Sequence, residues 1–524
     1  MADSVVLANL SLLLLCIVAT HLSTDPWPLI ITILLPCLFM ILAILLNYWL
    51  VPGGFAWRNH HQNSPKLRGP SGWPILGTLP NQMSALAHRK LAAMASSHGA
   101  TRLMAFSLGT TRAIISSHPE TAKEILCGSS FSDRPMKISA RLLMFERAIG
   151  FAPAGDYWRH LRRIAANYMF SPRRISGLEA LRQRVANEML EGALKEMEGR
   201  GFVELRGIFQ RGSLSNILES VFGSGLELEK EECLGEMVRE GYDLIAKFNL
   251  EDHLPLKFLD FQGVKRKCYR LAGKVNSVVG EMVKERKRAG DFGAGNDFLS
   301  ALLSLPMEDR LSDSDMVAVL WEMIFRGTDN ISVLLEWIMA RMVIHQDIQK
   351  KVQDELDTCV GNHRQVQDSD IPNLPYLQAI VKEVLRMHPP GPLLSWARLA
   401  VHDVHVGKIL VPAGTTTMVN MWAITHDPSI WNDPWVFRPE RFIEEEISIM
   451  GSDLRLAPFG SGRRVCPGRA LGLATVHLWL GRLLHEFKWL PIESVDLSEC
   501  LKLSLEMKMP LSCCMIRRCD IMSI

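Results

Sequence analysis

Cys466 lies in a run whose composition constrains both the local backbone and what can lie beside it. The run reads FGSGRRVCPGRALG over residues 459–472. Glycines at 460, 462 and 468 let the backbone turn tightly and lie close against a flat group without side-chain clash. The mostly apolar residues 471–484 predict a helix, which places Cys466 near a helix N-terminus, where backbone N–H groups and the helix dipole stabilise a thiolate. The run therefore predicts a loop that presents a thiolate to a flat cofactor.

The same run matches the pattern FxxGxRxCxG at five positions, and on these residues the chain resembles the cytochrome P-450 superfamily. The resemblance implies that the cofactor is haem b and that Cys466 is its axial metal ligand. It also implies that Phe459 packs by the sulfur, that Arg464 binds a haem propionate, and that Gly468 and Gly462 permit the close approach. The alternative is an inert core cysteine before a helix, since free cysteines are commonly buried.

A second motif, KEVLR, places Glu383 and Arg386 three residues apart on one predicted helix face, close enough to pair. It is followed by FRPERF over residues 437–442 and then by the cysteine loop. This order resembles the Glu-Arg-Arg triad of the family, and the resemblance makes Arg441 the third member.

A third motif, YWRHLR, places Trp158 and Arg162 one helical turn apart. An indole N–H and a guanidinium at that spacing suit a haem propionate, although an ordinary basic helix is the alternative. Arg398, which follows the helix-breaking segment HPPGP at residues 388–392, matches another propionate-binding arginine of the family.

Residues 314–343 predict one long helix that is apolar over most of its surface and therefore buried. Its polar residues Glu322, Arg326 and Asn330 recur every four positions and form one stripe. Gly327 in mid-helix costs roughly 1 kcal/mol relative to alanine, which indicates that something requires the missing side chain.

This helix resembles the oxygen-binding groove of the family, and the resemblance makes Gly327, Asp329 and Asn330 the catalytic set. Two positions depart from the family pattern: Arg326 replaces a small residue, and Asn330 replaces threonine. An amide can hold a water molecule but is no acid, so protons must pass through Asp329 and solvent. Arg326 either pairs with Glu322 at i,i+4 or faces the substrate, and the sequence leaves both open.

The chain has 524 residues, a length that by itself suggests about three domains. The motifs at 158, 327, 383 and 466 must nevertheless meet at one cofactor, so we expect a single catalytic domain, mainly α with a small β component. Apolar and polar residues alternate in 104–116 and 404–419, and this alternation predicts that both segments form β-strands. A net charge of +2 argues against a nucleic-acid partner. The 11 cysteines indicate no disulfide framework, which fits a reducing compartment.

The first 57 residues contain no lysine or arginine and hold two apolar stretches, 5–22 and 29–51. The second is long enough to span a membrane, while the first either spans or lies in the interface. Basic residues follow directly and place the rest of the chain in the cytosol. We therefore expect a membrane anchor (1–57) in contact with lipid, a proline- and glycine-rich hinge (58–80) and a catalytic domain (81–524) at the endoplasmic reticulum membrane.

The resemblance implies a microsomal haem-thiolate monooxygenase that inserts one oxygen atom of O2 into a hydrophobic small molecule. NADPH would supply the electrons through a flavoprotein, NADPH-cytochrome reductase, docked on a basic face. The candidate contributors to that face are Arg159, Arg163, Arg463 and Arg469. The sequence of residues 325–329 and the doubly apolar N-terminus resemble those of a plant subfamily associated with organ and seed growth, for which fatty-acid hydroxylation has been proposed.

Two alternatives remain. A haem-thiolate isomerase or dehydratase needs neither reductase nor proton relay, and Asn330 favours it. A non-enzymatic haem sensor is the third hypothesis, weakened by Asp329 beside Gly327.

Overall fold

The computed structural model describes residues 34–43, 51–54, 56–57, 67–73, 76–78, 86–247, 249–254, 260, 262–290, 297–394 and 396–518. The predicted anchor stretch 5–22 and most of 29–51 lie outside these residues. So does much of the predicted hinge.

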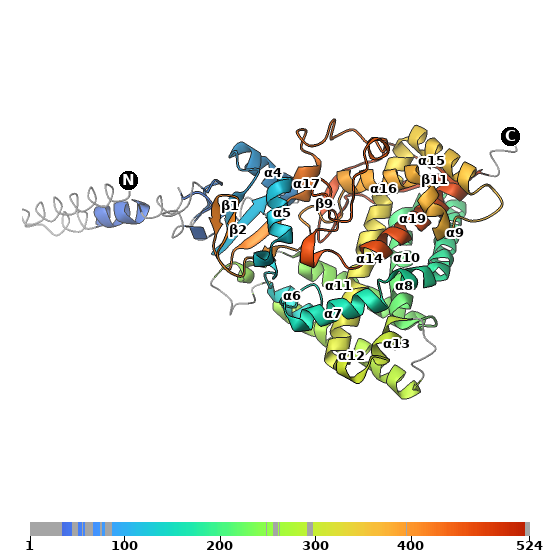
Figure 1. Ribbon diagram of the computed structural model, residues 1–524, viewed down its shortest axis with the longest axis horizontal. Coiled ribbons are helices and arrows are strands. Elements are labelled where there is room, and N and C mark those ends of the chain that lie inside the picture. Colours follow the sequence, from blue (N-terminus) through green and yellow to red (C-terminus); the bar gives the residue numbers. More distant parts are fainter. Residues whose placement is uncertain are drawn as a thin grey trace, which may run out of the picture.

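The described chain is mainly helical with a small β component, as the sequence predicts (Figure 1). The helices are α4 (Ala87–Ser97), α5 (Pro119–Cys127), α6 (Ile138–Leu143), α7 (Asp156–Tyr168), α8 (Pro172–Gly177), α9 (Glu179–Arg200), α10 (Leu205–Phe222), α11 (Leu228–Ala246), α12 (Val264–Ala289), α13 (Phe298–Leu303), α14 (Asp313–Ile344), α15 (Gln346–Cys359), α16 (Pro375–Met387), α17 (Met421–Thr425), α18 (Arg441–Glu444) and α19 (Arg469–Glu486). The strands are β1 (Met104–Leu108), β2 (Thr111–Ser116), β3 (Val203–Glu204), β4 (Arg398–Leu399), β5 (Val404–Val406), β6 (Ile409–Val411), β7 (Thr416–Val419), β8 (Phe487–Pro491), β9 (Glu499–Leu501), β10 (Leu505–Met507) and β11 (Ser512–Arg517).

Helix α14 confirms the predicted long buried helix and extends it by one residue at each end. The Ser312 side chain caps its first turn by accepting a hydrogen bond from the backbone N–H of Asp315. The apolar residues of its first half, Met316 to Phe325, pack in one core with α10, α11 and α12. Those of its second half, Val333 to Val343, pack in another with α9, α16 and α19. α14 thus joins two hydrophobic cores, which explains why it is apolar almost all round.

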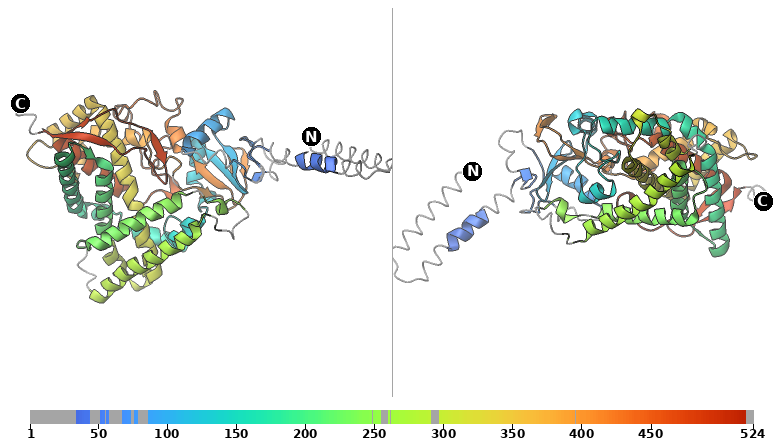
Figure 2. Two further views of the ribbon diagram at one scale, coloured as in Figure 1. Left: turned by 180° about the vertical axis from the view of Figure 1, so that it is seen from behind. Right: turned by 90° about the horizontal axis from the view of Figure 1, so that it is seen from below.

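Residues 104–116 supply β1 and β2 of the larger sheet, whose order is β1-β2-β7-β4 with β2 and β7 parallel. Residues 404–419 supply its strand β7 and a separate hairpin of β5 and β6, while β4 lies outside both predicted regions. A second sheet has the order β3-β11-β8, and β9 pairs with β10 in a hairpin. Figures 1 and 2 show the larger sheet, with α4 and α5 beside it, at the end of the molecule next to residues 34–43, and most of the other helices on the side where the C-terminus lies.

Residues 34–43 form a helix whose apolar side chains are largely exposed. These are Leu34, Leu35, Leu38, Phe39, Met40, Ile41 and Leu42, each at least 41% exposed. Within the described ranges, no helix is both long and apolar enough to cross a membrane.

Segments that the sequence assigns to the anchor and the hinge pack against the edge of the larger sheet. Trp57 is 1% exposed and donates its indole N–H to the Phe106 carbonyl oxygen at 2.8 Å. The backbone N–H of Ala105 donates to the Arg68 carbonyl oxygen at 2.9 Å. A Cβ on Gly69 would lie 1.9 Å from the Ala105 carbonyl oxygen, so only glycine allows this approach. These residues are therefore part of the folded body.

Candidate active site

The cysteine loop closes on itself directly before α19. The backbone N–H of Cys466 donates to the Phe459 carbonyl oxygen at 3.0 Å, and α19 begins three residues later at Arg469. Gly462 has a φ of +68°, and a Cβ there would lie 2.2 Å from the Leu126 carbonyl oxygen. A Cβ on Gly468 would lie 3.2 Å from the Phe170 ring. The predicted position of Cys466 at a helix N-terminus is confirmed.

A cavity of about 260 Å³, partly open to solvent, lies between this loop, α7 and α14. Its walls are mostly apolar. Among the described residues that line it, Cys466 is the only cysteine. The predicted site residues among them are Trp158, Arg162, Gly327, Asn330, Arg398, Phe459, Arg464, Cys466 and Gly468. Segments more than 300 residues apart in the sequence therefore meet here.

Guanidinium groups gather at this cavity. Arg134, Arg162, Arg326, Arg398 and Arg464 line it, and Glu322 is the only carboxylate among the described lining residues. Burial, together with repulsion from neighbouring arginines, lowers the pKa of Arg398 and of Arg464 to about 10. Burying several cations with one acid is unfavourable unless anions pair with them.

Arg134 is the member of this cluster that the sequence analysis missed. It donates to the Trp396 carbonyl oxygen at 2.8 Å, and its Nε has no hydrogen-bond partner. Burial, followed by repulsion from Arg398, Arg326 and Arg464, holds its pKa well below the usual arginine value. It lies in a loop outside every spacing pattern discussed above, so no local signal identifies it.

The predicted propionate-binding side chains donate to backbone carbonyl oxygens in this structure. The Trp158 indole N–H donates to Ile149 at 3.0 Å, and Arg162 donates to Val465 at 2.9 Å. Arg398 donates to Ser461 at 3.2 Å, and Arg464 donates to Ala152 at 2.6 Å. The Arg464 guanidinium also stacks over the Trp158 ring, 4.4 Å from its centroid. These contacts orient the side chains around one edge of the cavity.

The three-way pairing of Glu383 is confirmed. Its carboxylate accepts from Arg386 Nε and Nη2 at 2.8 and 2.9 Å, and from Arg441 Nε at 3.2 Å. Glu383 and Arg386 are fully buried. The unit ties α16 to α18 next to the cysteine loop.

Gly327 lies on the cavity wall and is required for helix packing. A Cβ there would lie 2.6 Å from the Ile217 side chain on α10. This contact explains why the buried helix carries a glycine at that position.

The two catalytic candidates beside Gly327 face different surroundings. Asn330 lines the cavity and is exposed within it. The carboxyl group of Asp329 lies in a more enclosed place beside the β9–β10 turn, where burial raises its pKa to about 6. The nearby Ser504 hydroxyl opposes that rise in pKa.

Arg326 pairs with Glu322, as one of the two hypotheses predicted, and it also lies on the cavity wall. Its Nη1 lies 3.7 Å from Glu322 Oε1, as expected for an i,i+4 pair. It also lines the cavity, stacks over the Trp396 ring at 5.3 Å, and has no hydrogen-bond partner at Nη1. Glu322 in turn accepts from the Gly150 backbone N–H at 2.7 Å.

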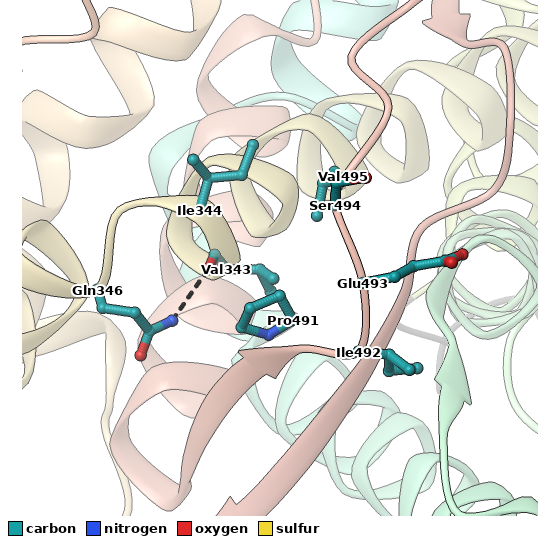
Figure 3. A pocket seen from close by; sticks show the side chains of 8 residues that line it. All are labelled: Val343, Ile344, Gln346, Pro491, Ile492, Glu493, Ser494 and Val495. Atoms are coloured by element: carbon teal, nitrogen blue, oxygen red, sulfur yellow. Dashed lines mark hydrogen bonds between the residues drawn. The ribbon is translucent and has the colours of Figure 1, made fainter.

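A second hollow, of about 520 Å³, lies on the surface where α14 ends and the chain leaves β8 (Figure 3). Its lining includes Val343, Ile344 and Ile492, and Gln346 donates there to the Val343 carbonyl oxygen at 3.0 Å. It contains none of the predicted site residues.

The first cavity fits a haem with a cysteine ligand. The site has a helix N-terminus that stabilises a thiolate, apolar walls, and more guanidinium groups than carboxylates. These features match a flat apolar macrocycle that carries two carboxylates. The fold and the site together define a haem-thiolate protein.

Comparison with known proteins agrees with this class. The family profile described as Cytochrome P450 matches residues 67–513. Cytochrome P450 78A5 of Arabidopsis thaliana is 53% identical over 480 residues, covering 89% of this chain and 92% of that protein. Cytochrome P450 78A3 of Glycine max is 52% identical, and the match covers 90% of this chain and 92% of that protein. A solved zebrafish cytochrome P450 structure with progesterone has a TM-score of 0.72 at 26% identity, and the match covers 82% of this chain and 99% of that chain.

The chain belongs to the cytochrome P450 family. It is a monooxygenase that uses haem with cysteine thiolate ligation. The plant relatives confirm the predicted resemblance to the subfamily associated with organ and seed growth.

Proposed function

We propose that this enzyme hydroxylates a fatty acid at the endoplasmic reticulum membrane, with electrons passed from NADPH by a flavoprotein reductase. The observation that carries the proposal is an apolar cavity, lined by Cys466, whose wall also includes the guanidinium-bearing side chain of Arg326, which is 34% exposed. The apolar walls suit an alkyl chain, and a guanidinium suits a carboxylate.

The residue roles follow from this geometry. Cys466 is the metal ligand, Phe459 packs beside the sulfur, and Gly468 admits the macrocycle. Trp158, Arg162, Arg398 and Arg464 hold the propionates, and Arg134 joins them. The haem, when bound, supplies oxygen activation. Gly327 and Asn330 lie in the cavity wall with Asp329 next to them in the helix, and protons reach the cavity through this part of α14.

The charge balance supports an acidic substrate. Five arginines face the cavity, against one carboxylate of the protein and two of haem b. Asp133, 3.8 Å from Arg464, offsets one more positive charge. One positive charge remains, and the partly exposed guanidinium of Arg326 on the cavity wall is the place where an added carboxylate is best accommodated.

The test follows the oxygen atom. With a plant reductase, NADPH and 18O2, the enzyme is expected to convert a fatty acid into a hydroxy acid that carries one labelled oxygen. Arg326→Gln should weaken fatty-acid binding by about 1.5 to 3 kcal/mol, the scale of a hydrogen bond to a charged group. It should leave binding of the matching fatty alcohol and the haem content unchanged.

Other outcomes are equally informative. If Arg326→Gln weakens binding of the fatty acid and of the matching fatty alcohol equally, Arg326 does not contact the fatty-acid carboxylate. Turnover of an oxygenated substrate without reductase, and without label in the product, would favour the isomerase or dehydratase that Asn330 kept open.

The basic face proposed for the reductase surrounds the cysteine loop. Arg159 pairs with Asp156, and Arg163 donates to Asp309 at 2.7 Å, so both charges are partly offset. Arg463 is exposed, which makes it the strongest contributor to docking.

Membrane attachment is proposed to reside in the N-terminal apolar segments. A chain that begins at residue 51 retains Trp57 and every proposed haem contact, so it should bind haem and shift from the membrane fraction toward the soluble fraction. Adding Trp57→Ala should cost about 3 to 5 kcal/mol of folding free energy, because a large buried side chain is lost. Fractionation and haem content measure these effects.

A truncated chain that cannot take up haem, when the full-length chain does so in the same host, would make the N-terminus part of the fold. Complete retention in the membrane fraction would place the membrane contact elsewhere.

A further inference from the structure

The part of α14 that lines the cavity, residues 324–330, has weak support as a helix, and we call it the cavity segment. Its side chains at Gly327 and Asn330 belong to the cavity wall, so one side of the segment has no packed neighbour. Glycine lowers helix stability. Thr328 donates to the Ile324 carbonyl oxygen at 2.8 Å, a bond of the kind that bends helices and slightly destabilises them. The segment therefore depends on the helices behind it.

Helix α11 packs closely against the cavity segment from behind (Figure 1). The ring of Phe325, which is fully buried, stacks on the ring of Tyr242 with the centroids 4.5 Å apart and 16° between the planes. A Cβ on Gly241 would lie 2.7 Å from the Phe325 ring, so the glycine allows this close approach. The two rings thus join α11 to α14 at the residue directly before Arg326.

A hydrogen bond accompanies the stacked rings. The Tyr242 hydroxyl donates to the backbone carbonyl oxygen of Phe325 at 2.8 Å. A carbonyl oxygen has two lone pairs, so it can accept this bond in addition to a helical one. Burial, followed by the charge of Asp329, raises the pKa of the Tyr242 hydroxyl well above its usual value. The hydroxyl therefore stays protonated and acts as a donor.

The support from α10 is of a different kind. A Cβ on Gly327 would lie 2.6 Å from the Ile217 side chain, so Ile217 packs directly on the helix backbone. This contact is apolar and sets no preferred angle, whereas a hydrogen bond fixes both distance and direction. Among the described residues, Tyr242 provides the only side chain outside α14 that donates to a backbone carbonyl of the cavity segment.

We propose that the Tyr242 hydroxyl is a positioning group for the active site, because it fixes the cavity segment of α14 in the place where Gly327 and Asn330 form the cavity wall. Tyr242 is absent from the described lining of the cavity, so it acts through α14 and is no catalytic residue. The inference concerns the haem-thiolate site and does not depend on which substrate is oxidised. Without the hydroxyl, the rings would still stack, but the segment would be free to slide along them.

Tyr242→Phe isolates the hydroxyl, because it keeps the ring and its stacking on Phe325. Tyr269→Phe on α12 is the matched control, since Tyr269 is 58% exposed and has no contact with α14. The first measurement is amide hydrogen exchange in the full-length protein with haem bound, followed by mass spectrometry on peptides that cover residues 321–332. Exchange there should become about fivefold faster in Tyr242→Phe, the factor that one ordinary hydrogen bond is worth. It should stay at the wild-type rate in Tyr269→Phe.

The second measurement compares two ligands of the haem iron by absorption titration. Imidazole needs only the open position at the iron, whereas 1-dodecylimidazole also lays its alkyl chain along the cavity wall. Tyr242→Phe should weaken 1-dodecylimidazole binding about tenfold, the effect of uncovering about two methylene groups, and imidazole binding by less than about twofold. A general loss of stability or of haem would change both ligands alike, so the difference between them reports the position of the wall.

Three results would overturn the proposal. Unchanged hydrogen exchange in Tyr242→Phe would show that the hydroxyl does not hold the cavity segment. Faster exchange with unchanged 1-dodecylimidazole binding would show that the cavity wall keeps its place without the hydroxyl. Equal weakening of both ligands would show that the substitution damages the haem site as a whole.

Discussion

Cys466→Ala is expected to abolish the red-shifted absorption band that the reduced protein shows under carbon monoxide. That band requires a thiolate on the ferrous haem, and Cys466 is the only cysteine among the described residues of the cavity wall. No other described residue of the cavity wall carries a thiol that could replace the lost thiolate ligand. Absorption spectra of the purified protein, reduced with and without carbon monoxide, measure the effect.

Cys127 provides a matched control. It lies beside the same loop, where its Sγ is 3.3 Å from the Ser461 hydroxyl, but it does not line the cavity. Cys127→Ala should keep the band at full intensity. A band that survives in Cys466→Ala, or disappears in Cys127→Ala, would mean that the ligand is assigned to the wrong cysteine.

Glu383→Gln should destabilise the folded enzyme by about 3 to 5 kcal/mol, the cost of removing one partner from a buried ion pair. Arg386 is 0% exposed and Arg441 is 5% exposed, so both guanidinium groups would remain buried without a countercharge. We expect a lower midpoint of denaturant unfolding and a low haem content after expression.

The control for Glu383 lies on α18 itself. Glu444 pairs with Arg438 at 3.2 Å, and its side chain is 59% exposed. Glu444→Gln should change stability by less than about 1 kcal/mol, because water screens the pair. Similar unfolding midpoints for Glu383→Gln and wild type would show that the buried unit does not hold the scaffold together.

Local patterns predicted those parts of the site whose partners are close in sequence. The cysteine loop, the i,i+3 pair of Glu383 and Arg386, and the stripe on α14 all depend on helix or turn geometry within a few residues. The hydrophobic pattern of residues 314–343 likewise reproduced α14 to within one residue at each end. Such features are visible because a side chain's neighbours on one turn follow from the backbone period.

Local sequence patterns do not predict the positions of Arg134 and Ser504. Each lies in a loop or turn, with no motif around it, and each gains its place from contacts with residues more than 150 positions away. Arg326 is an intermediate case: its pairing with Glu322 was predictable from spacing, but its place on the cavity wall depends on the packing of several elements.

The sequence by itself determined that a thiolate would stand before a helix, that the long helix 314–343 would be buried, and that one cofactor would join the motifs. Only the tertiary structure decided that Gly327 makes room for Ile217 and that Trp57 belongs to the folded body. It also decided that the hydroxyl beside Asn330 comes from residue 504. The physical reason is that spacing along the chain dictates contacts within one helix or turn. Contacts between distant segments depend on how every element packs at once.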